Sequence, residues 1–353
     1  MTTGSDSPGR RWALRLLGYG AALAGLVWVF HDVRPADAVR SMAGIRWGWI
    51  AVAVACDVAS YFSQGVRWSL LLRPLGRLSP VRATQAVYAA LFTNEMLPLR
   101  AGEILRVYLV SRWLGLDSAA VVSSIAVERL LDGVWLALAI ALTATLVPLP
   151  RDLVIGEEVL GMLVLLGIIV LALLLVRRRA GGTADGSRAD AGLEAGPTVR
   201  PGAWARARAI VERLLAALHR IGSSRTLYLA LAVSSLVLFF QMLSFWLVLH
   251  ACGLGLSFWQ GAAVFLIVHL GTALPNAPSN VGTYQFFCVV GLSLFGVNKT
   301  AAAGFSVAVF LILTLPLWAL GLLALGRGGL SLATLRRDVL RISRGGSSGE
   351  PSP

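Results

Sequence analysis

The sequence is poor in charge, in lysine and in cysteine. Only 14% of its 353 residues are charged, against about 25% in soluble domains, whereas 57% are hydrophobic and the mean hydropathy is +0.74. Lys299 is the only lysine, so the net charge of +13 comes almost wholly from arginine. Cys56, Cys252 and Cys288 stand far apart, without the spacing of a metal site. This composition excludes a water-soluble enzyme, a disordered chain and a disulfide-stapled secreted module.

The sequence also lacks the short motifs of common enzyme and nucleotide-binding classes. It has no GxSxG, no P-loop and no GxGxxG in a βαβ setting, which excludes an ATP-driven pump for this chain alone. Its histidines show no HExxH or other metal spacing. We therefore expect no metal, no cofactor and no catalytic residue. Despite a pI of 11.0 we expect no nucleic-acid partner, because the arginines lie between apolar runs.

Long apolar runs predict an all-α fold, a polytopic membrane bundle of about six full spans. A helix needs about 20 apolar residues to cross a bilayer. Two further stretches, 83–97 and 258–297, are interrupted by proline and glycine, and we expect broken, re-entrant hairpins there, with full spans as the alternative. The six segments that are long enough for full spans are 12–30, 47–66, 119–147, 159–176, 227–250 and 301–325.

The distribution of arginine predicts the orientation, because positively charged loops stay in the cytoplasm. Residues 66–113 carry seven arginines and two acids, and residues 177–225 carry ten arginines and four acids. The link 148–158 has one arginine and three acids. Six spans and two re-entrant hairpins place every basic loop inside. We expect a multi-pass protein of the inner (cytoplasmic) cell membrane with both termini cytoplasmic.

The same pattern divides the chain into two membrane halves joined by a basic, Gly- and Ala-rich cytoplasmic linker. Each half contains one of the two broken hairpins. The predicted units are an N-terminal half at 1–176 with its hairpin at 83–106, the linker at 177–225, a C-terminal half at 226–326 with its hairpin at 258–297, and a disordered basic tail at 327–353.

The first broken hairpin is dense in polar side chains. Glu103 lies three residues from both Arg100 and Arg106, so one carboxylate could hold two guanidinium groups. Ionisable groups at membrane depth usually face a cavity, although an interfacial loop with snorkelling arginines is the simpler alternative. The residues concerned are Asn94, Arg100, Glu103 and Arg106, with backbone breaks at Pro98 and Gly102.

A second polar cluster opens the third predicted span. Glu128 and Asp132 lie one helical turn apart and would repel each other unless a cation lies near them. Arg129 reaches Asp132 at i+3, and Arg100 or Arg106 could come from the broken hairpin. A structural ion-pair network and a direct functional role both remain open for this cluster.

Two other polar positions lie in the second predicted span. Asp57, inside the span, either lines a cavity or pairs with an arginine. Arg67 and Trp68 end the span, and we expect them to anchor it at the cytoplasmic interface.

The second broken hairpin resembles the first in its pattern. A Leu-Pro pair, a loosened stretch, a glycine and a polar residue follow one another in both. Paired broken helices in two halves are typical of inverted-repeat transporters. The residues singled out are Pro275, Pro278, Gly282 and Gln285, and the three backbone breaks among them are expected to act in gating.

Three motifs carry a resemblance to a known family. The segments NEMLPLRAGEILRVYLVSR, ERLLDGVWL and LPNAPSNVGTYQFFCVVGLSLFGV, preceded by GVRWSLLL, resemble the lysylphosphatidylglycerol synthase transmembrane-region family of flippase-like proteins. The resemblance spans about residues 12–325. It implies a bundle with re-entrant helices that moves or presents a lipid. Carried over by motif, it implies a working cavity lined by Pro98, Arg100, Gly102, Glu103, Arg106, Glu128, Arg129 and Asp132, with Pro275, Pro278, Gly282 and Gln285. The residues that we expect around a lipid headgroup are Arg100, Arg106, Glu103, Asn94, Glu128, Arg129, Asp132 and Gln285.

Two departures from that family limit what is carried over. The chain lacks the cytosolic aminoacyl-transfer domain of the synthases, so we expect no lipid synthesis by it. Many members have an acid where this chain has Gln285, which weakens any acid-dependent coupling at that position.

The expectation is therefore a flippase-like protein that binds and translocates an anionic lipid or lipid-linked headgroup. Arg100 and Arg106 would grip the phosphate, because guanidinium groups suit its geometry. One alternative is a non-transporting membrane partner of a glycosyltransferase or lipid synthase, which docks through the basic linker. Another is an embedded enzyme that uses Glu103 or Glu128 as general base.

Overall fold

The computed structural model describes residues 20, 22–33, 44–97, 101–147, 221, 225–273 and 278–327. Every regular element in this part of the chain is helical. Residues 22–30 form a helical segment, and η1 (Pro278–Asn280) is a 3₁₀ turn. The other helices are α3 (Trp47–Leu72), α4 (Pro80–Met96), α5 (Ala101–Leu114), α6 (Ser118–Leu146), α9 (Thr226–Ala251), α10 (Phe258–Ala273), α11 (Thr283–Ser293) and α12 (Lys299–Arg327).

Three of the described helices, α3, α9 and α12, are long and apolar enough to cross a membrane. With 26 residues, α3 and α9 each reach about 39 Å, more than the ~30 Å hydrocarbon core. The predicted spans 119–147, 227–250 and 301–325 coincide with α6, α9 and α12. The prediction of an all-α polytopic bundle is thus confirmed, while the predicted span 159–176 lies outside the described residues.

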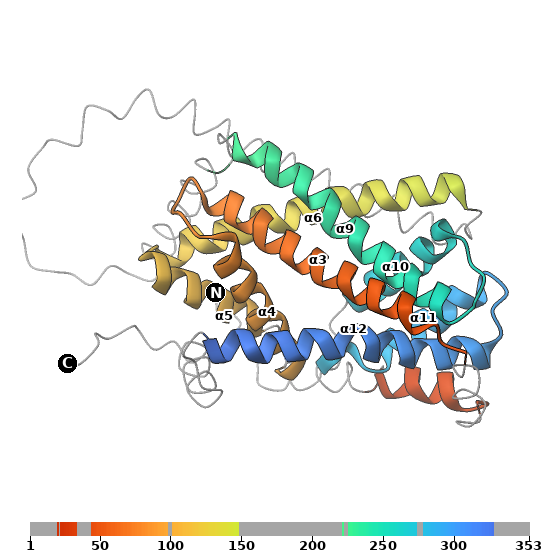
Figure 1. Cartoon of the computed structure of the whole chain (residues 1–353). Helices are drawn as coiled ribbons and strands as arrows, with labels where there is room; N and C mark the ends of the chain where they lie inside the picture. Colours follow the sequence, from red (N-terminus) through yellow and green to blue (C-terminus); the bar gives the residue numbers. More distant parts are fainter. Residues whose placement is uncertain are drawn as a thin grey trace, which may run out of the picture.

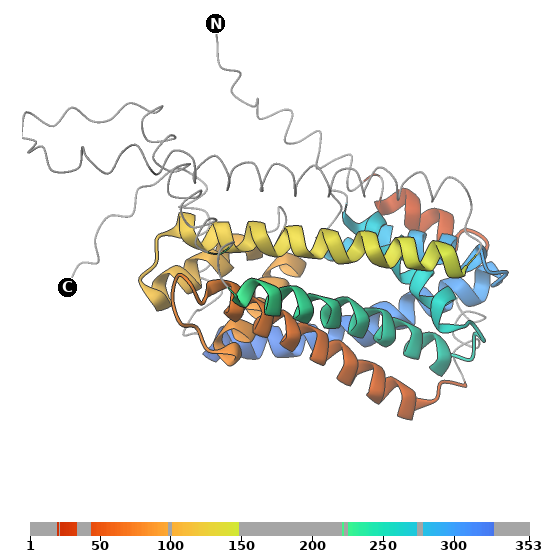
Figure 2. The same cartoon turned by 90° about the horizontal axis from the view of Figure 1, so that it is seen from above.

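The helices repeat in length along the chain. A 26-residue, a 17-residue, a 14-residue and a 29-residue helix follow one another from α3 to α6. From α9 to α12 the lengths are 26, 16, 11 and 29 residues. Figures 1 and 2 show α3 running antiparallel to α9, and α6 running antiparallel to α12. This is the arrangement that an inverted repeat produces.

The two short-helix pairs enter the bundle from opposite ends. The α4–α5 hairpin lies at the end where α3 finishes, and the α10–α11 hairpin lies at the end where α3 begins (Figures 1 and 2). Each has its own buried cluster: Trp68 and Leu105 belong to the first, Phe245 and Cys288 to the second. The hairpins are therefore packed separately and share the long helices α3 and α12.

Glycine allows the first hairpin to pack closely. A Cβ on Gly102 of α5 would overlap the carbonyl oxygen of Ala90 in α4, and one on Gly65 of α3 would overlap Thr84. The start of α4 is fixed by Ser79, whose hydroxyl accepts a hydrogen bond from the Arg82 amide at 3.3 Å, and by proline at the first turn. These contacts hold α3, α4 and α5 as one packed unit.

Candidate functional site

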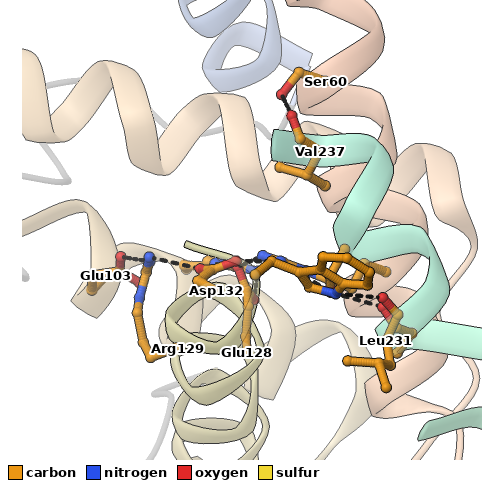
Figure 3. A network of polar contacts seen from close by, with 12 residues as sticks. Ser60, Glu103, Glu128, Arg129, Asp132, Leu231 and Val237 are labelled. Carbon is orange, nitrogen blue, oxygen red and sulfur yellow. Dashed lines mark hydrogen bonds and ion pairs between the residues drawn. The ribbon is translucent and has the colours of Figure 1, made fainter. Parts of the chain in front are cut away.

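Acidic and basic side chains of α3, α5 and α6 form one ion-pair network (Figure 3). Three arginines and three carboxylates take part, so their formal charges cancel. Their pairing satisfies most of the charges without a ligand. The members are Arg67 of α3, Glu103 and Arg106 of α5, and Glu128, Arg129 and Asp132 of α6.

Glu128 is the centre of the network and holds two guanidinium groups. Arg67 Nη2 donates to its Oε1 at 2.9 Å, and Arg106 donates to both of its oxygens, at 3.1 Å to Oε1. Only 1% of the Glu128 side chain and 4% of the Arg106 side chain are exposed. Such a fully buried charge is tolerated only with partners of this kind.

The network becomes more exposed toward Arg129. Arg67 also pairs with Asp132, whose other oxygen accepts from Arg129 Nη1 at 3.3 Å. Arg129 Nη2 in turn donates to Glu103 Oε1 at 2.6 Å. Figure 3 shows these labelled acids of α5 and α6 in one row with Arg129 between them. The Arg129 side chain is 53% exposed, so this end is the accessible one.

Trp68 completes the buried end of the network. The Arg106 guanidinium carbon lies 3.6 Å from the centre of the Trp68 ring, which is a cation–π contact. The indole Nε1 of Trp68 donates to Ser124 Oγ of α6 at 3.0 Å. The network therefore joins α5 to both α3 and α6.

The expected interfacial role of Arg67 and Trp68 is wrong. Both residues are fully buried, and α3 continues beyond them to Leu72. The physical reason is the pair of carboxylates on α6, Glu128 and Asp132, which need a buried cation. The sequence pattern predicts this cation in the first hairpin or at Arg129, whereas in the structure Arg67 of α3 pairs with both carboxylates. Arg67 is thus a site residue that the sequence analysis missed, although the unpaired acids already required one.

Other expectations for the first hairpin have mixed outcomes. Glu103 does not hold Arg106 but pairs with Arg129, and the acid that binds two arginines is Glu128. Asn94 Oδ1 accepts a hydrogen bond from the Gly102 amide at 2.8 Å and so caps the start of α5. The expected positions Pro98 and Arg100 lie outside the described residues.

In the second hairpin, Gln285 has a structural partner. Its Oε1 accepts from the Gly282 amide at 2.7 Å, and Gly282, at φ 90°, is the N-cap of α11. A Cβ on Gly282 would overlap the Ala22 carbonyl oxygen. The glycine therefore provides both a left-handed turn and a close helix approach. Pro278 begins η1, and Pro275 lies outside the described residues.

The tips of the two hairpins touch. Ser279 Oγ of η1 donates to the backbone oxygen of Glu95, near the end of α4, at 2.9 Å. Ser279 and Asn280 have φ values of 57° and 52°, so the backbone at this tip is in the left-handed region. This is the meeting of two broken helices that the repeated sequence pattern suggests.

A cavity of about 190 Å³ lies beside these tips and is walled by helices from both halves. Its polar lining contains two carboxyl groups, and its apolar lining is mainly aromatic. The lining residues are Asp57, Tyr61, Glu95, Gln241, Phe245, Phe265, Val268, His269, Thr272, Tyr284, Phe310, Leu313, Thr314 and Leu317. We call this space the central cavity.

The described residues expected around a headgroup do not line the central cavity. Arg106, Glu128 and Gln285 make hydrogen bonds within packed parts of the bundle instead. Of the two alternatives for Asp57, a cavity position or a pair with an arginine, the structure shows the cavity position. Among the described residues, no group of histidine, cysteine and acidic side chains could hold a metal ion.

The sequence of the chain matches the model of a known family. No individually curated protein matches the chain. Residues 14–321 match the family model described as lysylphosphatidylglycerol synthase TM region, which covers far more than half of the 353 residues. The chain therefore belongs to the lysylphosphatidylglycerol synthase transmembrane-region family.

Proposed function

We propose that this membrane protein translocates an anionic lipid by passing its headgroup through the central cavity. The observation that carries the proposal is the position of that cavity, beside the contact between Ser279 and Glu95 at the tips of hairpins from opposite ends. Discontinuous helices that meet inside a bundle are typical of transport sites. A cavity walled by both halves can open to either side when the halves move.

The charge of the two ends supports an orientation. Six exposed arginines gather where α3 and α12 finish and α9 begins (Figure 1). Such clusters stay on the cytoplasmic side and attract anionic headgroups. We therefore place this end in the cytoplasm of a cell-membrane protein, where it would collect the lipid. The arginines are Arg73, Arg77, Arg82, Arg112, Arg225 and Arg327.

The ion-pair network has a positioning role in this proposal. Arg106 already uses both terminal nitrogens on Glu128, so gripping a phosphate would require breaking a buried pair. The network instead holds α5 against α3 and α6. The second hairpin has no comparable ion pairs among its described residues, so it is the part that would move against the first.

Mass spectrometry of co-purified lipids tests this proposal. Thr314 lines the central cavity, whereas its neighbour Leu315 is 53% exposed on the outer surface of α12. We expect one anionic lipid enriched over bulk in the wild type and in Leu315→Trp, and lost in Thr314→Trp, which fills the cavity. Bulk lipid alone in all three would overturn the proposal. It would favour the non-transporting partner of a glycosyltransferase or lipid synthase.

A further inference from the structure

Asp57 differs from the paired acids of the described chain. It lies on α3 with 6% of its surface exposed and lines the central cavity. Glu128 and Asp132 have arginine partners, but no hydrogen bond or ion pair joins the carboxyl group of Asp57 to another described residue. A buried carboxyl group without a counter-charge is unfavourable in a membrane protein, and such groups commonly bind protons or cations.

Among the described residues that line the cavity with Asp57 there is a second acid, Glu95, and there is no lysine or arginine. Tyr61 of α3, Glu95 of α4, His269 of α10 and Tyr284 of α11 face the same cavity, with Tyr88 of α4 close to Tyr61 at 5.4 Å between ring centres. The described cavity residues of α9 and α12 are uncharged; their polar members are Gln241 and Thr314.

An anionic headgroup and an ionised Asp57 would repel each other strongly inside one small cavity of low dielectric constant. Binding a proton to Asp57 removes that repulsion. We infer that Asp57 binds a proton when the anionic headgroup enters the central cavity and releases it when the headgroup leaves. Translocation of the lipid is then coupled to movement of a proton in the same direction. This inference rests on the proposed function, and it names the proton as the ion that is coupled to transport of the lipid.

The proton step is simple. A hydronium ion reaching the cavity transfers H⁺ to a carboxylate oxygen of Asp57, which forms an O–H bond and leaves water. On the other side the carboxyl group returns the proton to water. One negative headgroup charge and one positive charge thus cross together. His269 is exposed while lining the cavity, so it stands where the cavity meets the outside of the protein.

Asp57 is better placed for this role than Glu95. Glu95 is only partly buried, and it lies at the hairpin tip, where its backbone oxygen is held by Ser279. Asp57 is inside α3, a continuous helix packed along α9. A proton site inside a continuous helix keeps its place in both open states of the cavity, whereas the surroundings of Glu95 change when the second hairpin separates from the first.

Lipid movement in proteoliposomes under an imposed pH gradient tests the coupling. The full chain is reconstituted, and the rate at which fluorescent phosphatidylglycerol changes leaflet is measured with the gradient in each direction. One pH unit biases a one-proton step by at most about tenfold. We expect a several-fold dependence on gradient direction in the wild type and its loss in Asp57→Asn. Asp117→Asn, at the exposed N-cap of α6 where asparagine also caps well, should keep it.

Proton binding is measured independently of lipid movement by infrared difference spectroscopy of the reconstituted protein across a pH series. We expect a protonated-carboxyl band in the wild type and in Asp117→Asn that is missing in Asp57→Asn. Identical spectra for all three, or a gradient dependence that survives in Asp57→Asn, would overturn the inference. A wild type that shows the Asp57 band but moves no lipid would sustain the proton site and refute the proposed lipid transport.

Discussion

Arg106 of α5 and Glu128 of α6 form a two-point ion pair that is almost completely shielded from solvent. The pair crosses from the first hairpin to a long helix, and Trp68 of α3 covers its guanidinium face. A charge pair of this kind fixes two elements in one relative position, because either partner alone would be left buried without compensation. The first hairpin is therefore a rigid part of the bundle.

Removing the central carboxylate should destabilise the protein strongly. In Glu128→Gln, Arg106 keeps a buried positive charge without its partner, for an expected loss of about 3–5 kcal/mol in the free energy of unfolding. Asp117→Asn changes an exposed acid and should shift the melting temperature little. Thermal unfolding in detergent compares the two. Equal melting temperatures would contradict the structural role given to Glu128.

The arginines of the network should differ according to burial. Arg67→Ala leaves Asp132 and Glu128 with one arginine partner each, and we expect the free energy of unfolding to fall by about 3–5 kcal/mol. Arg129→Ala removes contacts at a half-exposed position and should cost at most about 1 kcal/mol. The same unfolding assay ranks them. An Arg129 effect as large as that of Arg67 would show that the accessible end is as important as the buried one.

Gly102→Ala should separate α5 from α4. The added methyl group would overlap the backbone oxygen of Ala90, which cannot change rotamer as a side chain can. We therefore expect the free energy of unfolding to fall by at least about 2 kcal/mol. Gly326 of α12 has open space around it, and Gly326→Ala is the matched control, expected to be neutral or slightly stabilising. A stable Gly102→Ala variant would argue against the close approach of these helices.

The capping role of Gln285 predicts a pair of opposite results. Gln285→Leu loses the acceptor for the Gly282 amide and should lower stability by about 1 kcal/mol. Gln285→Glu keeps an acceptor, and a carboxylate is favoured at a helix N-terminus, so it should retain most of the stability. Melting temperatures of the two variants decide the matter. Loss of lipid binding without loss of stability in Gln285→Leu would assign the residue to the lipid instead.

Closing the contact between the hairpin tips should stop transport. In a chain without its three native cysteines, Glu95→Cys with Ser279→Cys is joined by a short bifunctional thiol reagent. We expect lipid movement to stay above the protein-free rate before cross-linking and to fall to that rate after it. Unchanged movement in the cross-linked protein would show that the hairpins need not separate.

Hydropathy was enough to predict where several of the long helices lie along the chain. The apolar runs behind α6, α9 and α12 are continuous, and their expected limits agree closely with the structure. The end of α3 was misplaced, because Arg67 has the sequence appearance of an interfacial residue. Its partner Glu128 is 61 positions away, and no local pattern identifies which arginine meets it.

The candidate site was harder to predict than the fold. The need of Glu128 and Asp132 for a cation followed from their spacing, but the identity of that cation depended on packing between helices. Gln285 three residues after a glycine at a helix start is a capping signal that was available and was interpreted as a lipid contact. The central cavity draws its walls from both halves, so its lining could not be assigned from any single segment.

The most direct test of the account is lipid movement by the purified full chain in proteoliposomes. Fluorescent phosphatidylglycerol and fluorescent phosphatidylcholine are followed in parallel, with protein-free vesicles and with the cavity-filling variant Thr314→Trp beside the surface variant Leu315→Trp. We predict that the wild type and Leu315→Trp move phosphatidylglycerol faster than phosphatidylcholine, and that Thr314→Trp moves neither above the protein-free rate. A wild type no faster than protein-free vesicles, or a Thr314→Trp variant as fast as the wild type, would contradict transport through the central cavity.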